Sequence, residues 1–418
     1  MKVLWISHSP GNYNSHNHVG SGGWVQSLQL LVEKEGDIEL GLAFVHPKDS
    51  APVKQGNTTY FPIRSFFGGS KAKMLLSRLL FQERREAQRR IQKLLEIISE
   101  FKPDLIHIWG CEHYYIEIVK YTKIPCVVDI QSILMSWLNV FLPPGVSEFD
   151  LIKFDKIRFF LQCGLHYGLS NFKRGVKLEA SLLNSIKYWI GRTEWDRDAI
   201  SVLSKSAKYY QCNRMLPDIY FENRWRDRDN MSVVITSIIS PSLYKGYDLI
   251  LKTAKILEEA QVDFVWNVCG VDRGNFFRPS IASFFEKKFK IHISNQKLIL
   301  HGKLERRKLV DLLLKSDVYV HPSYIENSCN ALSEAQLLGV PSIGVNAGGV
   351  ASILANNSGV LVPANDPLVL AAKIIRMKEK ATALAYSESG RCEALKRNNS
   401  HEITININNI YKDIINNN

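Results

Sequence analysis

The amino-acid sequence predicts an α/β fold made of two doubly wound parallel sheets in tandem, with helices on both faces of each sheet. At 418 residues the chain is too long for one typical core. Short apolar runs alternate with amphipathic stretches almost from end to end, and strands that are apolar on both faces and separated by helices indicate parallel sheets. We therefore expect two Rossmann-like domains facing each other across a cleft.

The first series of elements lies in residues 1–222. It opens with the strand-like run KVLWIS and a helical stretch, GWVQSLQLLVEK, whose apolar residues share one face. Helical patterns follow at about 75–100 and 113–121, and the series ends with YWIGRTE, a short helix and AKYYQC. The intervening strands are IELGLAFV, DLIHIW and PCVVDI. This pattern predicts the N-terminal domain.

A charged stretch at 223–230, NRWRDRDN, predicts a linker, and a second domain is expected over 231–395. The strands of that domain are MSVVITS, DFVWNVCG, KLILHG, DVYVHPS and PSIGVN, each followed by a helical segment. The tail at 396–418 has isoleucines at helical spacing and predicts a closing helix that could cross back to the first domain. Those isoleucines are Ile405, Ile407, Ile410 and Ile414.

Composition narrows the class of protein. Hydrophobic residues make up 45% and charged residues 22%, which is ordinary for a globular protein, and the net charge of +12 favours an anionic partner such as a nucleotide or a lipid headgroup. The seven cysteines are scattered singly without a CxxC pair, as expected in a reducing cytoplasm. The N-terminus lacks a signal-peptide pattern, and there is no long apolar run. We expect a cytoplasmic protein.

The stretch ENSCNALSEAQLLGVP carries the strongest functional signal. Ligands of open α/β sheets bind where strands end and helices begin, and the strand DVYVHPS leads here into a helix that should start near Cys329 with Ser328 as N-cap. The helix N-terminus is then an anion site flanked by Glu326 and Glu334, which can accept hydrogen bonds from hydroxyls. A ligand with both phosphates and hydroxyls is a nucleotide sugar. The alternative is a charge–dipole pair beside a solvated glutamate.

The segment PSYIENSCNALSEAQLLGVPSIGVNAGGV resembles the C-terminal signature of the retaining glycosyltransferases of family 4, which have the GT-B fold. That signature is a Glu, seven residues, a second Glu, a small-residue helix, G-x-P and a glycine pair. The chain has its counterparts at Glu326, Glu334, Gly339, Pro341, Gly348 and Gly349. Further similar pieces occur in the expected order: GSGGWVQSLQ, KPDLIHIWG, IGRTEWD, YKGYDLIL and LILHGKLERRKLVDLL.

The resemblance implies roles for individual residues. Glu326 would contact the donor sugar and Glu334 the ribose hydroxyls, while Lys245 would meet the pyrophosphate. Gly22 and Gly23 would let the N-terminal loop approach the phosphates, because glycine has no Cβ in the way. The remaining expected contacts are Gln131, Gly302 and the helix start formed by Ser328, Cys329, Asn330 and Ala331. The alternatives are that the two glycines form a plain turn and that Lys245 is a solvated residue at a helix start.

The chain departs from the family pattern at four positions. Many relatives carry an arginine about five residues before the lysine, where this chain has Ser240, and Arg273 or Lys303 would have to compensate. Gln131 stands where a histidine is common. In the motif YYQCNRMLPDIYF, Arg214 and Pro217 replace a Glu and an Arg. These changes keep open a non-catalytic role.

No metal or other cofactor is expected. The two DRD copies, at 196–198 and 227–229, stand at a helix start and in the linker, and the sequence places neither at a strand end, where a DxD motif binds metal. His8, His16 and His18 share one loop without the spacing of a metal site, and a position near the acceptor fits them better.

Residues 71–93 form a basic amphipathic stretch with eight basic and two acidic side chains. Such a helix is typical of membrane-surface binding, and a solvated helix packed on the first domain explains it equally well. The basic residues are Lys71, Lys73, Arg78, Arg84, Arg85, Arg89, Arg90 and Lys93. Binding to the inner face of a membrane would fit a lipid-linked acceptor.

We therefore expect a metal-independent retaining glycosyltransferase of hexosyltransferase type in cell-surface polysaccharide synthesis. The first domain would hold a saccharide or lipid-linked acceptor and the second the nucleotide-sugar donor. The alternatives are a nucleotide-sugar epimerase, which needs acid–base residues that the sequence does not single out, and a non-catalytic sugar-nucleotide-binding module. Nucleic acid is not an expected partner, since net charge alone supports it.

Overall fold

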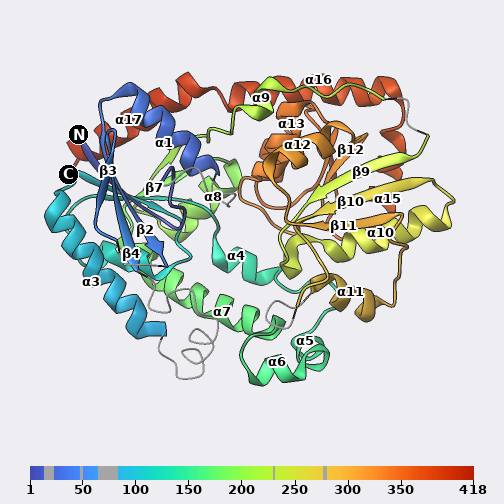
Figure 1. Ribbon diagram of the computed structural model, residues 1–418, viewed down its shortest axis with the longest axis horizontal. Helices are drawn as coiled ribbons and strands as arrows, with labels where there is room; N and C mark the ends of the chain where they lie inside the picture. Colours follow the sequence, from blue (N-terminus) through green and yellow to red (C-terminus); the bar gives the residue numbers. More distant parts are fainter. Residues whose placement is uncertain (14–22, 48–49, 65–82, 229–230, 276–279) are drawn as a thin grey trace. The chain divides into compact units, whose positions relative to one another are not determined.

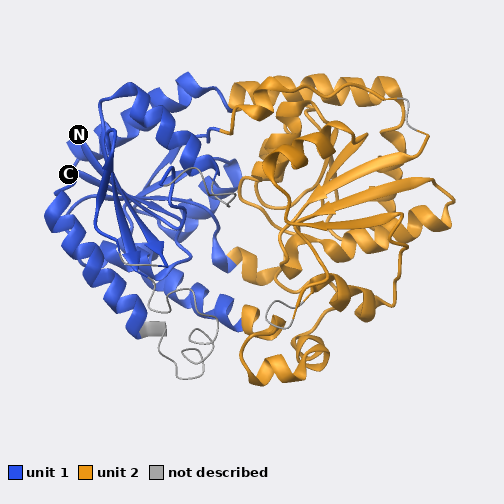
Figure 2. Ribbon diagram, in the orientation of Figure 1, with its two compact units in different colours: residues 1–135, 170–215, 398–418 blue, residues 136–169, 216–397 orange. Residues whose placement is uncertain are grey.

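The computed structural model describes residues 1–13, 23–47, 50–64, 83–228, 231–275 and 280–418. Gly22, His16, His18 and the 71–82 part of the basic stretch lie outside these residues. The chain forms two compact units, coloured separately in Figure 2. Unit 1 comprises residues 1–135, 170–215 and 398–418, and unit 2 comprises 136–169 and 216–397.

These units differ from the expected domains in two places. Residues 136–169 belong to unit 2, and the chain passes from unit 1 to unit 2 after residue 215, before the expected linker begins. The expected linker is packed on unit 2 because Trp225, 4% exposed, donates its indole N–H to the Ser316 carbonyl at 2.7 Å. Its backbone N–H also donates to the Leu338 carbonyl at 2.6 Å. The charged composition did not reveal this anchoring tryptophan.

Unit 1 contains a sheet with the strand order β3-β4-β2-β1-β5-β6-β7-β8, parallel except for the pair β3–β4. In Figure 1, helices α1 (Gly23–Glu35) and α17 (Ser400–Asn416) lie on one side of this sheet and α3 (Glu83–Phe101) on the other. Its strands are β1 (Lys2–Ser7), β2 (Glu39–His46), β3 (Val53–Gln55), β4 (Thr58–Arg64), β5 (Leu105–Trp109), β6 (Cys126–Asp129), β7 (Tyr188–Gly191) and β8 (Lys208–Gln211).

The sequence did not predict β3 and β4. Strand β4 contains Pro62, and proline has no backbone N–H to donate to a neighbouring strand. Proline is tolerated here because β3 pairs only with residues 58–60 of β4, so no described residue pairs with β4 beyond Tyr60 on that side. The stretch expected to be helical at 113–121 is a 3-10 helix, Tyr114–Lys120.

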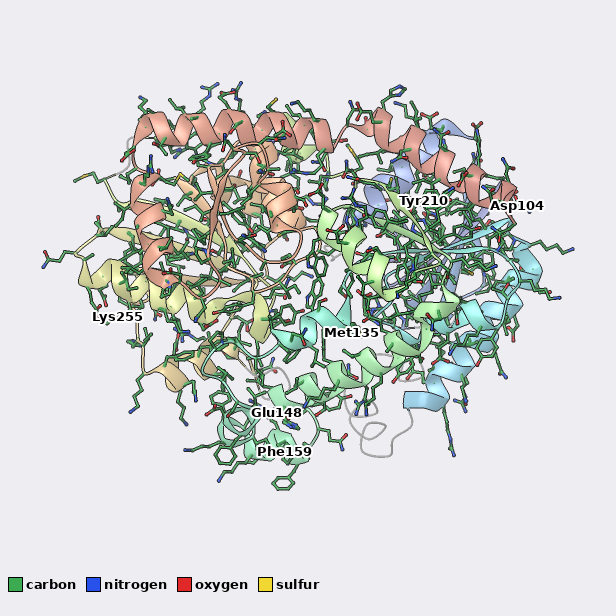
Figure 3. The ribbon with its side chains drawn as sticks, turned by 180° about the vertical axis from the view of Figure 1, so that it is seen from behind. Asp104, Met135, Glu148, Phe159, Tyr210 and Lys255 are labelled. Atoms are coloured by element: carbon green, nitrogen blue, oxygen red, sulfur yellow. The ribbon has the colours of Figure 1, made fainter. Side chains whose placement is uncertain are left out.

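Helix α17 closes unit 1. The Tyr411 hydroxyl accepts a hydrogen bond from the Trp5 indole at 3.1 Å and lies 2.6 Å from His107 Nδ1, deep in the core. At the sheet edge Asp413 accepts hydrogen bonds from Tyr210, labelled in Figure 3, and from Lys208. The buried isoleucines include Ile403, whereas Ile405, which was expected on this face, is 47% exposed. The four buried isoleucines are spaced by four, three and four residues, which places them on one face of the helix.

Unit 2 contains a fully parallel sheet with the order β11-β10-β9-β12-β13-β14. Numbered within the unit, this is the 3-2-1-4-5-6 order of a Rossmann sheet. The strands are β9 (Val233–Ile238), β10 (Phe264–Cys269), β11 (Leu298–Gly302), β12 (Val318–His321), β13 (Ser342–Val345) and β14 (Val360–Val362). The sequence analysis did not predict strand β14, because its three residues are too short a run to show a strand pattern.

Helices cover both faces of the unit 2 sheet (Figure 1). One layer contains α12 (Arg306–Leu314), α13 (Asn330–Leu338) and α16 (Lys380–Arg397), and the other contains α10 (Tyr247–Glu259), α11 (Ile281–Phe289) and α15 (Pro367–Arg376). The shorter helices are α5 (Glu148–Phe154), α6 (Lys156–Phe160), α9 (Ile219–Glu222) and α14 (Val350–Ile353). Helix α8 (Glu194–Leu203) belongs to unit 1. Helices α4 (Leu134–Asn139) and α7 (Leu165–Leu182) join the two units.

Candidate functional site

The expected donor residues meet at the topological switch point of the unit 2 sheet. Strands β9 and β12 are adjacent, but their crossover connections run toward opposite edges of the sheet, which leaves a crevice at their carboxyl ends. Lys245 ends the short 3-10 helix Leu243–Lys245 after β9, and Glu326 lies in the loop after β12. The sheet topology therefore brings together two residues that are far apart in the sequence.

The loop that carries Lys245 is held against the loop that carries Glu326. Gly246 has φ +77°, and a Cβ at this position would lie 2.1 Å from the Pro322 carbonyl oxygen, so only glycine fits. The Tyr324 backbone N–H donates to the Tyr244 carbonyl at 2.9 Å. The two loops thus have little freedom to move apart.

The glycine pair of the signature holds Glu326 from its other side. Gly348 has φ +58°, and a Cβ there would lie 2.0 Å from the Glu326 carbonyl oxygen. The Gly349 N–H donates to that same oxygen at 2.8 Å. The pair therefore positions the Glu326 backbone, a role that the spacing in the sequence did not reveal.

Lys245 and Glu326 form a buried ion pair in which the lysine ammonium hydrogen-bonds Glu326 Oε1. Their side chains are 18% and 12% exposed. Burial alone would raise the pKa of the Glu326 carboxyl, but Lys245 and His321 lower it to about 2. Burial likewise opposes the charged lysine, and Glu326 raises the pKa of Lys245 above its ordinary value. Both groups are therefore charged across the physiological pH range.

His321, at the end of β12, extends this cluster. Its Nε2 lies 3.3 Å from Glu326 Oε1, and its Nδ1 lies 3.3 Å from the Cys329 sulfur. Burial would lower the pKa of His321, but its contacts with Cys329 and Glu326 raise it to about 9. The ligand atoms of His321, Glu326 and Cys329 lie within 4.8 Å of one another and could formally hold a metal ion. The Lys245 ammonium on the same carboxylate repels a cation there.

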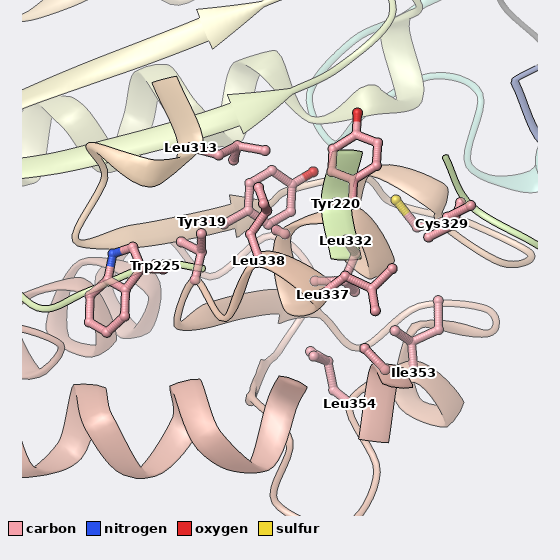
Figure 4. Packing of buried hydrophobic residues seen from close by; sticks show 14 of the residues in the cluster. Tyr220, Trp225, Leu313, Tyr319, Cys329, Leu332, Leu337, Leu338, Ile353 and Leu354 are labelled. Atoms are coloured by element: carbon pink, nitrogen blue, oxygen red, sulfur yellow. The ribbon is translucent and has the colours of Figure 1, made fainter. Parts of the chain in front are cut away.

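Helix α13 presents its N-terminus to this cluster. The helix begins at Asn330 with Cys329 as N-cap, and Cys329 makes no side-chain capping bond. The expected N-cap, Ser328, lies one residue too early, and Ala331 is in the first turn. Figure 4 shows the apolar residues of the helix, Leu332, Leu337 and Leu338, packed among Tyr220, Trp225 and Tyr319. Hydrophobic packing therefore holds the helix in place while its first backbone N–H groups remain available to an anion.

Glu334 lies one turn into α13 and is half-buried. Burial raises the pKa of its carboxyl to about 7, although a hydrogen bond from the Tyr220 hydroxyl and the charge of Arg306 lower it. Tyr220, on α9, was not predicted as a site residue, although it lies within the motif YYQCNRMLPDIYF. At neutral pH Glu334 therefore exists in both protonation states.

Unit 1 has a pocket of about 300 Å³ at its own switch point, between β1 and β5. Gln131, just after β6, lies in its wall, as do residues that the sequence analysis did not assign. The lining residues are Ser7, His8, Ser9, Trp24, Val25, Trp109, Glu112, His113 and Gln131. Gly23 begins α1 next to Trp24, so the described part of the predicted glycine loop borders this pocket.

Polar and aromatic groups both line the unit 1 pocket. The rings of His8 and His113 stack at 4.9 Å, and burial lowers the pKa of both histidines. Burial raises the pKa of the Glu112 carboxyl to about 7, and its Oε2 has no hydrogen-bond partner among the described residues. The pocket therefore holds an acid–base group beside aromatic surfaces.

Arg214 stabilises the wall of the unit 1 pocket. Its guanidinium donates to Asp129 Oδ1 at 2.9 Å and lies 4.9 Å from the centre of the Trp24 ring. Gln131 donates to the same Asp129 oxygen at 2.7 Å. Asp129 thus links the residue that departs from the family motif to the glutamine that replaces the common histidine.

Comparison with known proteins identifies the second half of the chain. Residues 221–398 match the family described as glycosyl transferases group 1. They contain the whole Lys245–Glu326 cluster and Glu334, so the candidate donor site lies within the glycosyl transferases group 1 region.

Solved structures extend the likeness to the full length. Sucrose-phosphate synthase from Thermosynechococcus elongatus has a TM-score of 0.74 at 13% identity over 100% of both chains. Anabaena HepE, solved in complex with UDP-glucose, has a TM-score of 0.63 at 15% identity, covering 99% of this chain and 100% of that one. These likenesses show the GT-B fold, with its two Rossmann-like domains.

A D-inositol 3-phosphate glycosyltransferase from Xylanimonas cellulosilytica is 34% identical over 31% of this chain and 30% of its own length. An uncharacterized 41.2 kDa protein in the cps region of Klebsiella pneumoniae is 26% identical over 34% of this chain and 35% of its own length. The chain thus spans about a third of the length of the curated relatives it matches.

Within the group 1 region, the other expected contacts are dispersed. Gly302 ends β11, two strands from β9, and accepts a hydrogen bond from Gly270 N–H at 2.6 Å. Arg273, a candidate to replace the arginine missing at Ser240, donates to both Glu286 carboxylate oxygens at 2.9 and 2.8 Å. Arg273 would have to leave this pair to reach a ligand. No helix in the described part of the chain could span a membrane.

Proposed function

We propose that the protein is a glycosyltransferase that moves a sugar from a nucleotide-sugar donor to a saccharide or lipid-linked acceptor, with retention of configuration, in cell-surface polysaccharide synthesis. The observation that carries this proposal is the Lys245–Glu326 ion pair at the switch point of unit 2, beside the uncapped N-terminus of α13. This site offers a cation and backbone N–H donors, which can bind a pyrophosphate, and a carboxylate, which can accept hydrogen bonds from sugar hydroxyls.

The chemistry of donor cleavage fits these groups. When the bond between the sugar and the nucleoside diphosphate breaks, negative charge develops on the departing phosphate oxygen. A fixed ammonium and the positive end of a helix dipole stabilise that charge without reorganisation, which lowers the barrier. In this proposal Lys245 and the 328–331 backbone supply both, so metal is not required.

Glu326 would act as a hydrogen-bond acceptor. A carboxyl whose pKa is lowered to about 2 stays ionised at neutral pH and cannot donate a proton to the leaving group. It can accept hydrogen bonds from donor-sugar hydroxyls and keep Lys245 in place. With retention, the departing phosphate oxygen takes the proton of the acceptor hydroxyl on the same face of the sugar, and unit 2 needs no separate base.

The comparisons support the donor and the product class. HepE was solved with UDP-glucose, and an E. coli trehalose-6-phosphate protein with a TM-score of 0.64 was solved with UDP-2-fluoro glucose. The relative in the Klebsiella cps region supports a role in surface polysaccharide synthesis. A nucleotide-sugar donor is accordingly the first ligand to test.

A donor screen tests the proposal directly. The full-length protein would be heated in the presence of UDP-, GDP-, ADP- and TDP-sugars, and a ligand at about 100 times its dissociation constant should add roughly 2.7 kcal/mol of stability. The stabilising donor would then be incubated with saccharide and lipid-linked acceptors, and the anomeric configuration of the product determined by NMR. A donor that binds but is never turned over would favour a non-catalytic binding module. An inverted product would exclude the retaining mechanism.

A second candidate, nucleotide-sugar epimerisation, is favoured by the Glu112 carboxyl with its pKa near 7 beside His113 in the unit 1 pocket. Such an enzyme would change the donor sugar with no acceptor present. Incubation of the donor alone in D₂O separates the two: an epimerase incorporates deuterium into the sugar, and a transferase does not.

A further inference from the structure

Unit 1 contains a second pocket, of about 530 Å³, between helix α3 and the carboxyl end of β4. Four basic side chains and one acidic side chain line it, so it is strongly cationic. The lining residues are Ser50, Pro62, Ile63, Arg64, Glu86, Arg89, Arg90 and Lys93. This pocket includes none of the residues that line the pocket at the β1–β5 switch point.

The helix presents its lining residues at positions 86, 89, 90 and 93, which lie on one face of α3 because they are spaced by three and four residues. The ion pair between Arg90 and Glu86 uses Arg90 Nη2. Arg90 Nε and Ser50 Oγ are both buried without a hydrogen-bond partner among the described residues. Buried donors without a partner are costly, and an anion in the pocket would satisfy them.

The basic pocket and the switch-point pocket belong to the same unit, and Arg90 of the first acts electrostatically on two residues of the second. The charge of Arg90 helps to lower the pKa of His8 and of His113, and both histidines line that neighbouring pocket. One ligand could therefore place an anionic group beside Arg90 and a neutral part near Glu112. A sugar that carries a phosphate has this division of charge.

We propose that the basic pocket binds a phosphate group of the acceptor, either a monoester, a diester or a pyrophosphate. This proposal rests on the proposed glycosyltransferase function and names the acceptor class. Arginine guanidinium groups match phosphate oxygens in a bidentate geometry, and several cations together favour a group that carries more than one negative charge. Two sources share this chemistry: a soluble phosphorylated saccharide and the headgroup of a lipid-linked saccharide.

The test compares two double variants with the same loss of charge. Arg89→Gln with Lys93→Gln removes two cations from the pocket. Lys54→Gln with Lys120→Gln removes two exposed cations of unit 1 that do not line it and lie outside the basic stretch 71–93. Both pairs are made in full-length protein carrying Lys245→Ala, which weakens pyrophosphate binding at the candidate donor site. Inorganic pyrophosphate is the soluble probe, titrated by calorimetry at low salt.

The pocket variant should bind pyrophosphate about 10-fold or more weakly, because each lost contact is a charge-assisted hydrogen bond, and the control variant should bind as its parent does. Equal weakening in the two variants would mean that general surface charge binds the probe, and the proposal would be wrong. Equal and undiminished binding would also overturn it. Circular dichroism on both variants checks that α3 remains folded.

Vesicles then distinguish the two sources. Phosphatidylglycerol vesicles present a phosphodiester headgroup on a surface, and phosphatidylcholine vesicles serve as the zwitterionic control. Co-sedimentation that the pocket variant loses and the control variant retains supports a lipid-linked source, whereas pyrophosphate binding without co-sedimentation supports a soluble phosphorylated saccharide. The donor screen on wild-type protein is independent of this pocket, so failure here would leave the proposed transferase function standing.

Discussion

Lys245 and Glu326 form a buried ion pair across the switch point of the unit 2 sheet, although 81 residues separate them in the sequence. Adjacent parallel strands bring their loops together, and Gly246 and Gly348 allow the backbones to approach closely. The pair holds a charged lysine in the free protein. A bound pyrophosphate would share that lysine, so ligand binding and the ion pair should be coupled.

Replacing Lys245 with alanine should lower turnover by roughly 100-fold or more, since a fixed cation would no longer stabilise the leaving group. It should also destabilise the protein, because the buried Glu326 carboxylate loses its main partner. Lys255→Ala is the matched control: this lysine lies on α10 (Figure 3), is 43% exposed and pairs at the surface. Kinetics and thermal unfolding of both variants provide the measurement, and wild-type turnover in Lys245→Ala would remove this residue from the mechanism.

Glu326→Ala should give a loss of similar size, and the double variant should lose less than the sum of the two single effects. Residues that act as a pair are not additive, and the coupling free energy measures their interaction. A double-mutant cycle on kcat/KM supplies this number. Strict additivity would show that the two residues act separately.

Gly348→Ala should abolish donor binding, because its Cβ would lie 2.0 Å from the Glu326 carbonyl and displace that loop. Gly56 is a matched control, since it has the same φ of +58° and a Cβ added there would meet nothing within 4 Å. Gly56→Ala should cost only the backbone strain, about 1 kcal/mol, and keep donor affinity. Calorimetric donor titration of both variants checks this, and equal donor affinity would refute a positioning role for Gly348.

Donor affinity should rise with pH between about 6 and 8. Burial raises the pKa of Glu334 to about 7, and only the ionised carboxylate can accept hydrogen bonds from two ribose hydroxyls. Glu334→Gln should bind more weakly at pH 8 and lose this pH dependence. A steep profile that persists in Glu334→Gln would assign it to another group.

The same carboxyl should make the folded state less stable as pH rises. Its pKa is higher in the folded protein than in the unfolded chain, where the ordinary value is 4.5, so stability falls between about pH 4.5 and 7 and then levels off. Glu334→Gln removes that contribution. Its melting temperature relative to wild type should therefore increase from pH 5 to pH 8, and a constant difference would contradict the shift.

Removal of metal should leave activity largely intact. The Lys245 ammonium beside Glu326 repels a cation from the cluster of His321, Glu326 and Cys329, so this cluster should not hold a metal ion. Activity measured with and without saturating EDTA tests this. Cys329→Ser would remove the one soft ligand of that cluster. Activity abolished by EDTA, restored by manganese or zinc and sensitive to Cys329→Ser would establish a metal site there.

Local patterns in the sequence determined much of the secondary structure of this protein. Alternating apolar runs and amphipathic helices are set by near neighbours, so they predicted the parallel strands β1, β2, β5, β6, β9 to β13 and the helices between them. The spacing of Glu326 and Glu334 around a helix start also led us to expect an anion site at α13, which stays a prediction. Both properties depend on residues within about ten positions of each other.

The tertiary structure decided what depends on distant residues. Short edge strands such as β3 and β14 form because a neighbour pairs with them, and Trp225 holds the predicted linker only because Ser316 and Leu338 lie beside it. The pocket with Glu112 needs three strand ends at one sheet edge, and the basic pocket needs α3 against β4. The charge states of Glu326 and Glu334 were also undetermined by sequence, because burial and partners from other elements set the pKa of a carboxyl.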